Sequence, residues 1–391
     1  MFELFKSLIF INIKIRREIR FIMINTFYKK LANLAINYAV NIKKGERIFI
    51  TGPALAEELF QAMYIESIKA GGHPLLNILI EGTQELRLKY SSEEQLLYVD
   101  PIQKSILKEF DSYIVISGDY NTRKMSLVDP KLITKVQGSP ANRELWDILM
   151  ERMGKKELRY LVLPFPCNSF AQEANMDLFS YFEFIKKALF LDQEDPVKEW
   201  LEIEKKQEVI CNSLKETAKI QVVGEDTDLT MSVKGRLWLN DCGHINLPAG
   251  EIYTAPIENS VNGHIRFTYP GIYQGTEIQN IYLEFKDGKV IKCSADKGEE
   301  LLKELLKIEN ADILGEFAIG TNYGITQFTK NMLFDEKLGG TIHCALGSGI
   351  EEAGSKNKCG IHWDILKDMK LKGSRILADD KVIYEEGKWK I

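Results

Sequence analysis

The spacing of apolar residues changes near residue 217, and this change constrains the fold more than any other feature of the chain. Before it, apolar runs alternate with segments whose apolar residues recur at helical intervals. The runs are 47–51, 74–80, 111–117 and 158–164, and the helical segments are 25–41, 55–70 and 140–153. This order of strand, helix and strand predicts βαβ units and a mostly parallel sheet flanked by helices.

Short alternating runs, typical of antiparallel strands, follow a charged helix predicted at 196–217. The runs are 219–223, 229–233, 265–269, 278–285 and 290–294, with one further helix at 298–308. Asp287-Gly288 between the last two runs predicts a hairpin turn. With 391 residues, two domains are expected. Residues 23–217 would form an α/β domain that ends in the linker helix, and residues 218–391 a β-rich C-terminal domain.

Residues 1–22 fit this plan poorly. An apolar stretch at 8–11 comes before a basic cluster, Lys14, Arg16, Arg17 and Arg20, which reverses the order of a signal peptide. We interpret this segment as an extension, either mobile or the product of an upstream start codon. The other interpretation is a basic peripheral membrane anchor, although one short segment would bind weakly.

Composition excludes several functional classes. The net charge of −5 argues against nucleic acid as a partner, since phosphate binding needs a basic surface. No apolar run approaches the length of a membrane span. The six cysteines are scattered without a CxxC pair, which indicates neither a disulfide framework nor a structural zinc site and favours the reducing cytoplasm. They are residues 167, 211, 242, 293, 344 and 359.

Residues 340–364 contain two of the five histidines. Around His362 and Asp364 polar and apolar residues alternate, which is the period of a strand and points both polar side chains to one face. His343 ends a second short β-prone run. Imidazole beside carboxylate suits a divalent cation such as Zn, Co or Mn. The alternative is a core histidine paired with a surface acid.

Two glutamates follow glycine directly, Glu251 in LPAGE and Glu316 in LGEFAIGTN. Glu316 lies between Ile313-Leu314 and Phe317-Ala318-Ile319. A glutamate in such an apolar run is paired, is a ligand, or is exposed on the open face of a strand.

Taken together these motifs resemble the M29 aminopeptidases, the aminopeptidase T and AmpS type. The resemblance rests on PAGEIYTAP, GEFAIGTN, FDEKLGGTIH and HWD, and it extends to DTDLTMSVKGRLWL, NSVNG and PFPCNSFAQEANM. It covers the chain from about residue 23 to the C-terminus. Each motif alone is weak, but their joint occurrence is specific.

The resemblance implies a cytoplasmic metalloaminopeptidase that hydrolyses peptides with two cocatalytic divalent ions, of Zn, Co or Mn, and a bridging water. Glu251, Glu316, His343, His362 and Asp364 match the metal-binding positions, and Glu316 is also expected to act in catalysis. The C-terminal domain would then hold the metals. The resemblance further implies a homodimer, with no nucleic acid or membrane partner.

One position departs from the family pattern. The peptidases of the family carry a tyrosine seven residues after the match to His343, and this chain has Ile350 there, which cannot donate a hydrogen bond. Glu351 or Glu352 is an alternative acid–base group, or part of a solvated loop. Tyr323 is an alternative donor. His244 and His264, with Asp241 and Cys242, are alternative ligands or structural residues. The alternative function is a relative that keeps the fold and metal but is a non-peptidase hydrolase or a binding protein.

Overall fold

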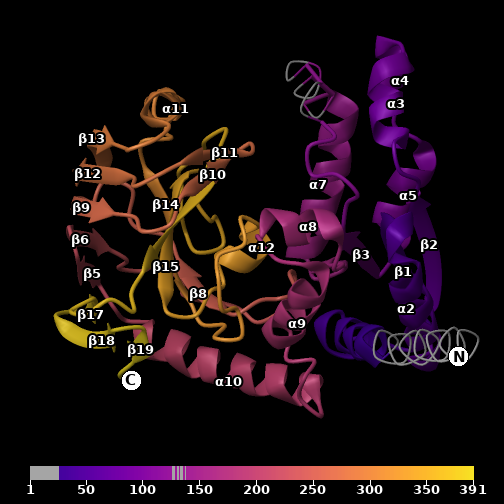
Figure 1. The fold of residues 1–391 in the computed structure, drawn as a ribbon, viewed down its shortest axis with the longest axis horizontal. Helices are drawn as coiled ribbons and strands as arrows, with labels where there is room; N and C mark the ends of the chain where they lie inside the picture. The colour runs from indigo at the N-terminus through magenta and orange to yellow at the C-terminus, as the bar shows by residue number, and fades with distance from the viewer. Residues whose placement is uncertain (1–25, 126–127, 130–131, 133–134, 137) are drawn as a thin grey trace, which may run out of the picture. The chain divides into compact units, whose positions relative to one another are not determined.

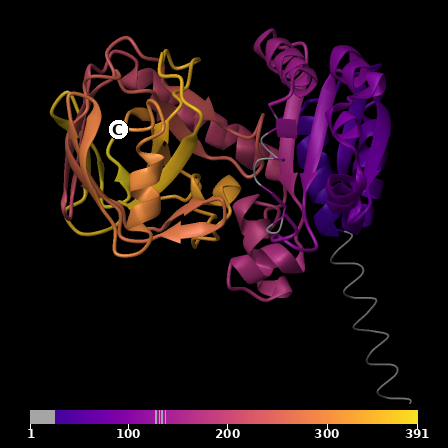
Figure 2. The ribbon, with the colours of Figure 1, turned by 90° about the horizontal axis from the view of Figure 1, so that it is seen from above.

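The computed structural model describes residues 26–391 except 126–127, 130–131, 133–134 and 137 (Figures 1 and 2). The predicted extension at 1–22 therefore lies outside the described residues. The chain divides into two compact units. The first contains the described residues up to Gln172, with Asp177–Val197 and His244–Leu247. The second contains Glu173–Met176, Lys198–Gly243 and Pro248–Ile391.

The first unit is built on a four-stranded parallel sheet in the order β2-β1-β3-β4, as the alternating pattern predicts. Its strands are β1 (Arg47–Pro53), β2 (His73–Leu79), β3 (Ser112–Ser117) and β4 (Arg159–Pro164). A bridge from Val162 to Asn246 lies beyond β4 at one edge. The predicted helices are present as a helix at 26–34 that continues into the π-helical turn η1 (Ala35–Ala39), α2 (Glu57–Lys69) after the turn η2 (Ala54–Ala56), and α7 (Pro140–Gly154).

Among the described residues of this unit, five further helices have no counterpart in the sequence prediction: α3 (Thr83–Tyr90), α4 (Glu93–Leu97), α5 (Pro101–Glu109), α8 (Asn168–Glu173) and α9 (Leu178–Ala188). Helix α3 buries none of its residues, so it lacks the apolar periodicity that marks a helix. The start of α4 is nevertheless encoded locally, by a capping box between Ser92 and Gln95. The predicted linker helix is α10 (Pro196–Leu214).

The second unit holds an eight-stranded antiparallel sheet in the order β13-β12-β9-β6-β5-β17-β18-β19, a five-stranded antiparallel sheet in the order β16-β15-β14-β8-β7, and the pair β10-β11 (Figure 1). The eight strands of the first sheet are β5 (Lys219–Gly224), β6 (Thr227–Ser232), β9 (Asn262–Arg266), β12 (Tyr282–Lys286), β13 (Lys289–Ser294), β17 (Arg375–Ala378), β18 (Lys381–Glu385) and β19 (Lys388–Trp389). The other strands are β7 (Leu239–Asp241), β8 (Glu251–Thr254), β10 (Gly271–Tyr273), β11 (Thr276–Ile278), β14 (Leu314–Gly320), β15 (Thr341–Gly347) and β16 (His362–Asp368). Besides α10, most of which belongs to this unit, the described helices here are α11 (Glu299–Leu305) and α12 (Met332–Asp335).

Several predicted boundaries are wrong in this unit. The run 278–285 is not one strand, because Asn280 has a positive φ of 55° and ends the extended backbone between β11 and β12. Strand β9 begins three residues before the predicted 265–269, and α11 is shorter than 298–308. His343 is the third residue of β15 rather than the end of a run. The Asp287-Gly288 hairpin is confirmed, and both residues have positive φ, as a type I′ turn requires.

A single apolar core joins the two large sheets of the second unit. Ile220, Val222 and Leu229 from the eight-stranded sheet belong to the same buried cluster as Ile252 and Phe317 from the five-stranded sheet. Side chains alternate along a strand, so the neighbours of Ile252 and Phe317 on the five-stranded sheet point away from this core, toward the opposite face of the sheet. Among the described residues no helix has both the length and the apolar character needed to cross a bilayer.

Candidate metal centre

All five predicted ligands lie on the five-stranded sheet. Strand β8 carries Glu251, β14 carries Glu316, β15 carries His343, and β16 carries His362 and Asp364. The register sets Gly320 opposite Glu251, Ala318 opposite His343 and Ala345 opposite Asp364, so all five side chains leave one face. The shared face of His362 and Asp364 confirms the alternation seen in the sequence.

Glu316 is the centre of this group. Its Oε2 lies 3.1 Å from His362 Nε2, and its Oε1 lies 3.5 Å from His343 Nε2. Glu251 Oε2 is 3.3 Å from the same His343 nitrogen, and Asp364 Oδ1 is 3.5 Å from His362 Nε2. Side chains from β8 and β15 can meet above β14 because Ala318 and Gly320 add no bulk there. One carboxylate thus faces two imidazoles through different oxygens.

Three atoms of these ligands are buried without a hydrogen-bond partner among the described residues. They are Glu251 Oε2, Asp364 Oδ1 and His343 Nδ1. Glu251 and Asp364 are over nine-tenths buried, as are Glu316 and His343. Burying a carboxylate oxygen without a partner is costly, and a cation offsets that cost. The ligand atoms of Glu316, His362 and Asp364 also lie within 4.8 Å of one another. The donor set therefore fits a divalent metal of borderline hardness.

His362 differs from the other four in being partly open to solvent, with 33% of its side chain exposed. Its Nδ1 lies 2.8 Å from the Ser348 carbonyl oxygen. A carbonyl only accepts, so Nδ1 carries the hydrogen and Nε2 is left to face Glu316 and Asp364. This is the usual arrangement of a metal-binding histidine, whose second nitrogen is held by a backbone or carboxylate acceptor.

The carboxylates and imidazoles change one another's pKa values strongly. Burial disfavours the imidazolium of His343, but Glu251, Glu316 and Asp364 raise its pKa to about 9. In the same way Asp364 and Glu316 outweigh burial and raise the pKa of His362 to about 11. Burial opposes ionisation of Glu316, yet hydrogen bonds with the two histidines lower its pKa to about 2. The carboxylates thus favour positive charge on the neighbouring imidazoles, which is the place that a bound cation would take.

Lys337 was not singled out in the sequence, although it lies in the FDEKLGGTIH motif. Its Nζ is 2.6 Å from Glu251 Oε1 and 3.2 Å from Asp241 Oδ2, and it also pairs with Glu336. Burial would lower the pKa of Lys337, but Glu251, Glu336 and Asp241 hold it well above its usual range. The ammonium donates hydrogen bonds to Glu251 and Glu336 and forms an ion pair with Asp241. The pairing fixes one oxygen of Glu251 and leaves the other facing His343.

Tyr253 is a second residue on this face that sequence reasoning missed. It follows Glu251 by two positions on β8 and lies opposite Ala318. Burial, with the nearby carboxylates of Asp241, Glu251 and Glu316, raises its pKa above the ordinary value. The signal was present in PAGEIYTAP, where strand alternation puts Tyr253 and Glu251 on one face.

The loop between β15 and β16 carries Ile350, Glu351 and Glu352. The Ile350 carbonyl accepts a hydrogen bond from the Ser355 amide, and Glu351 is exposed and 3.4 Å from Lys358 Nζ. The Tyr323 hydroxyl donates to the Gly387 carbonyl at 2.7 Å, which directs it to a backbone group outside the predicted ligand set.

The alternative histidines stand apart from the five ligands. His264 lies on β9 of the eight-stranded sheet, where its ring contacts Tyr282. His244 belongs to the first unit, where its Nδ1 lies 3.0 Å from the Ala39 carbonyl oxygen. Asp241 pairs with Lys337, and Cys242 is buried.

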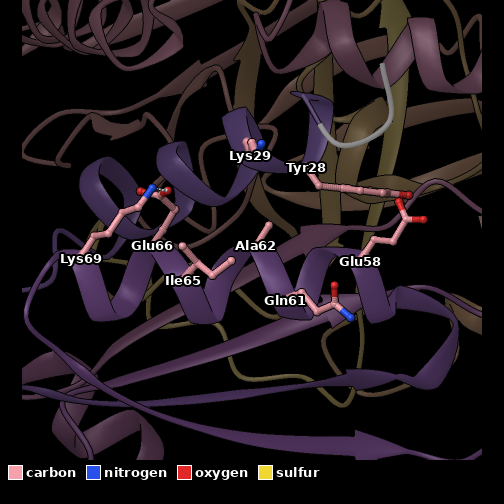
Figure 3. Close-up of a pocket in the computed structure, with 8 residues that line it drawn as sticks. All are labelled: Tyr28, Lys29, Glu58, Gln61, Ala62, Ile65, Glu66 and Lys69. Atoms are coloured by element: carbon pink, nitrogen blue, oxygen red, sulfur yellow. Dashed lines mark hydrogen bonds and ion pairs between the residues drawn. The ribbon is translucent and has the colours of Figure 1, made fainter. Parts of the chain in front are cut away.

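A cavity of about 300 Å³ lies in the first unit (Figure 3). Its lining comes from the helix at 26–34, with Tyr28 and Lys29, and from α2. Glu66 on α2 pairs with Lys69 at 2.7 Å. The lining includes neither histidine nor cysteine, so this cavity lacks the donor set of the five-stranded sheet.

Comparison with known proteins identifies the family of the chain. The family described as thermophilic metalloprotease (M29) matches residues 25–389. Aminopeptidase T of Thermus thermophilus is 27% identical over 83% of this chain and 85% of its own length. Aminopeptidase 2 of Geobacillus stearothermophilus is 26% identical over 92% of this chain and 97% of its own length. Aminopeptidase AmpS of Bacillus subtilis is 25% identical over 93% of this chain and 99% of its own length. The solved structure of wild-type AmpT from Thermus thermophilus has the same fold, with a TM-score of 0.81 over 93% of this chain and 99% of that one at 22% identity.

Proposed function

This chain belongs to the M29 family of metalloproteases, and from that premise we propose that it is a metal-dependent aminopeptidase acting at the site around Glu316. Membership makes it a hydrolase of peptide bonds that depends on divalent metal. The names of its relatives narrow the reaction to removal of N-terminal residues. The same relatives give no support to the alternative of a non-peptidase hydrolase or a binding protein.

The position of Glu316 between two imidazoles supports two metal ions rather than one. Glu316, His362 and Asp364 would hold one ion, and Glu251, His343 and Glu316 would hold the other. The ions are Zn, Co or Mn, which accept both imidazole and carboxylate. When bound, such ions polarise the peptide carbonyl and provide a nucleophilic water near neutral pH.

The chain's own residues hold and orient this site. Lys337 fixes one oxygen of Glu251, and the Ser348 carbonyl fixes the tautomer of His362. Glu316, whose two oxygens lie near different histidines, would act in catalysis as the ligand shared by both ions and so would help to orient the reacting groups. The partly exposed edge of His362 is the side from which we expect substrate to enter. We further propose a homodimer in the cytoplasm as the working form.

The test is a panel of aminoacyl p-nitroanilides, measured after chelation and again after adding Zn, Co or Mn. We expect hydrolysis to vanish on chelation and to return with at least one of the three metals. N-acetylated versions of the same substrates serve as the matched control and should not be cleaved. Equal cleavage of free and acetylated substrates would contradict an aminopeptidase, and no cleavage with any metal would contradict a peptidase.

A further inference from the structure

Hydrolysis of a peptide bond places negative charge on the carbonyl oxygen. Water adds to the carbonyl carbon, the π electrons move to the oxygen, and the C–N bond then breaks as the amine leaves with a proton from that water. A neutral hydrogen-bond donor aimed at this oxygen lowers the barrier. The predicted ligands are carboxylates and imidazoles that would hold the metal, so a side-chain donor to this oxygen would come from another residue on the same face.

Two candidate donors are already engaged. The ammonium of Lys337 donates to Glu251 and Glu336 and pairs with Asp241, so it is held by these carboxylates. The Tyr323 hydroxyl donates to the Gly387 carbonyl. Position 350 is isoleucine, which has no donor.

Tyr253 meets the requirement. Tyr253 on β8 pairs with Ala318 on the central strand β14, and Ala318 pairs in turn with His343 on β15. Only the small alanine side chain therefore lies between Tyr253 and His343 across the sheet. Glu316 is two residues from Ala318 on β14 and is therefore the diagonal neighbour of Tyr253, at about 7–8 Å between Cα atoms, a distance that an aromatic side chain spans. Tyr253 is only partly buried, unlike Glu251 and Glu316 beside it.

The hydroxyl of Tyr253 is also uncommitted. Within the described part of the chain this hydroxyl has no hydrogen-bond partner. It is not among the buried polar atoms without a partner, so the hydroxyl is accessible to solvent. A phenol is both a donor and an acceptor, and it is neutral at the pH where peptidases of this type act.

We propose that Tyr253 is a catalytic residue that donates a hydrogen bond to the oxyanion during peptide hydrolysis. This inference rests on the proposed function and adds to it the residue that stabilises the transition state. The phenol keeps its proton throughout, so it is neither the nucleophile nor a ligand.

The decisive variant is Tyr253→Phe, which removes one oxygen atom and keeps the ring. We expect kcat on leucine p-nitroanilide to fall on the order of 100-fold, the usual effect of losing one such donor. Metal content and melting temperature should not change, and KM should change by less than about threefold, since the contact forms only in the transition state. Tyr323→Phe is the matched control and should retain wild-type kcat.

Binding provides a measurement that does not depend on turnover. The probe is the phosphonic acid analogue of leucine, whose tetrahedral oxygens imitate the transition state, and calorimetry compares it with leucine on the metal-loaded protein. Tyr253→Phe should weaken the phosphonate by roughly the factor lost in kcat and leave leucine binding unchanged. Ile350→Tyr in the Tyr253→Phe background tests whether a phenol from the loop restores the donor, and a partial recovery of kcat supports the role.

Failure of each idea gives a different result. If wild-type protein cleaves no aminoacyl substrate, the proposed function fails, but the phosphonate titration still judges Tyr253. Equal phosphonate affinity in wild type and Tyr253→Phe overturns the Tyr253 role. The role is also overturned if neither protein binds the phosphonate, or if Tyr253→Phe keeps the wild-type kcat. Loss of metal together with activity in Tyr253→Phe would also overturn it, by making the residue structural.

Discussion

At the scale of single residues, Glu316 has the most demanding position, because each of its oxygens faces a different imidazole. Glu316→Gln replaces one of those oxygens with an amide nitrogen, which cannot bind a cation. We expect the variant to lose most bound metal and to lose hydrolysis by more than about 10³-fold while keeping its fold. Elemental analysis and circular dichroism measure the two effects.

Glu351→Gln is the control for that variant, since Glu351 is exposed and pairs only with exposed Lys358. It should keep full metal content. Unchanged metal stoichiometry in Glu316→Gln would show that Glu316 is not a ligand.

Lys337 holds three buried carboxylates together, so its charge should matter for stability. Lys337→Met keeps the side-chain length but leaves Glu251, Asp241 and Glu336 without their cation. Breaking a buried pair by removing one partner costs about 3–5 kcal/mol. Urea unfolding of the metal-free protein should show this loss. Lys219→Met, which breaks an exposed pair with Asp380, should cost under about 1 kcal/mol, and a similar loss in both variants would contradict the prediction.

Asp335 gives the protein a pH-dependent stability. Burial raises its pKa to about 7, from an ordinary value of 3.8, although the Thr329 amide and hydroxyl both donate to Oδ1. Between these values the folded state keeps a proton that the unfolded state has lost. This contribution to stability is therefore full below about pH 4 and is lost as the pH rises to about 7.

Asp335→Asn cannot titrate, and its amide oxygen can still accept from Thr329. The unfolding free energy of the variant minus that of wild type should therefore become more positive from pH 4.5 to pH 7.5. Urea titrations of both proteins at several pH values measure this difference. A difference that is constant across the range would mean that Asp335 is ionised in the folded state throughout.

At the scale of elements, the sequence predicted strands best where alternation was strong. Strand β16 and its polar face were predicted correctly from His362, Trp363 and Asp364, because period-2 alternation is a local property. Which strands lie beside β16 is not local. The contacts of Glu316 with His343 and His362 depend on the pairing of β14, β15 and β16, which one sequence does not specify. The family resemblance, rather than the pattern, supplied the five ligands together.

The missed helices and the divided strand have different causes. Helix α3 has no apolar face to detect. The run 278–285 reads as one strand because Asn280 is a single polar residue between apolar ones, and its left-handed backbone becomes visible only in the structure. Lys337 was overlooked because its partner Glu251 is 86 residues away in the sequence. Tyr253 was overlooked although the local alternation of β8 places it on the same face as Glu251.

The backbone of Asn280 can be tested directly. Its φ of 55° suits asparagine and glycine, and its side chain also bonds Arg266 and Asp296. Asn280→Val places a β-branched residue in this conformation, which costs about 1–3 kcal/mol. Asn280→Gly removes the same hydrogen bonds without that strain. We expect the valine variant to be the less stable of the two in urea unfolding, and equal stability would mean that the side-chain bonds alone matter.

At the scale of the whole molecule, all five ligands belong to the second unit, which has its own core. A metal whose free concentration is 100 times its dissociation constant stabilises the folded state by about 2.7 kcal/mol. Chelation should therefore lower the melting temperature of the second unit by roughly 5–10 °C and leave that of the first unit unchanged.

Intrinsic fluorescence separates the two, because Trp200, Trp238, Trp363 and Trp389 belong to the second unit and only Trp146 to the first. Glu316→Gln is the control and should melt at the same temperature with or without chelator. A shift of both transitions by the same amount would contradict a metal site confined to the second unit.

The uneven exposure of the ligands has a kinetic consequence. Glu251 and His343 are buried, whereas His362 is partly exposed to solvent. Of the two proposed ions, the one held by His362 should therefore exchange with its surroundings faster than the one held by Glu251 and His343. Loading would then be ordered, with the deep position filled first. An enzyme built in this way retains a resident ion when the supply is poor, and its activity follows the availability of the second ion alone.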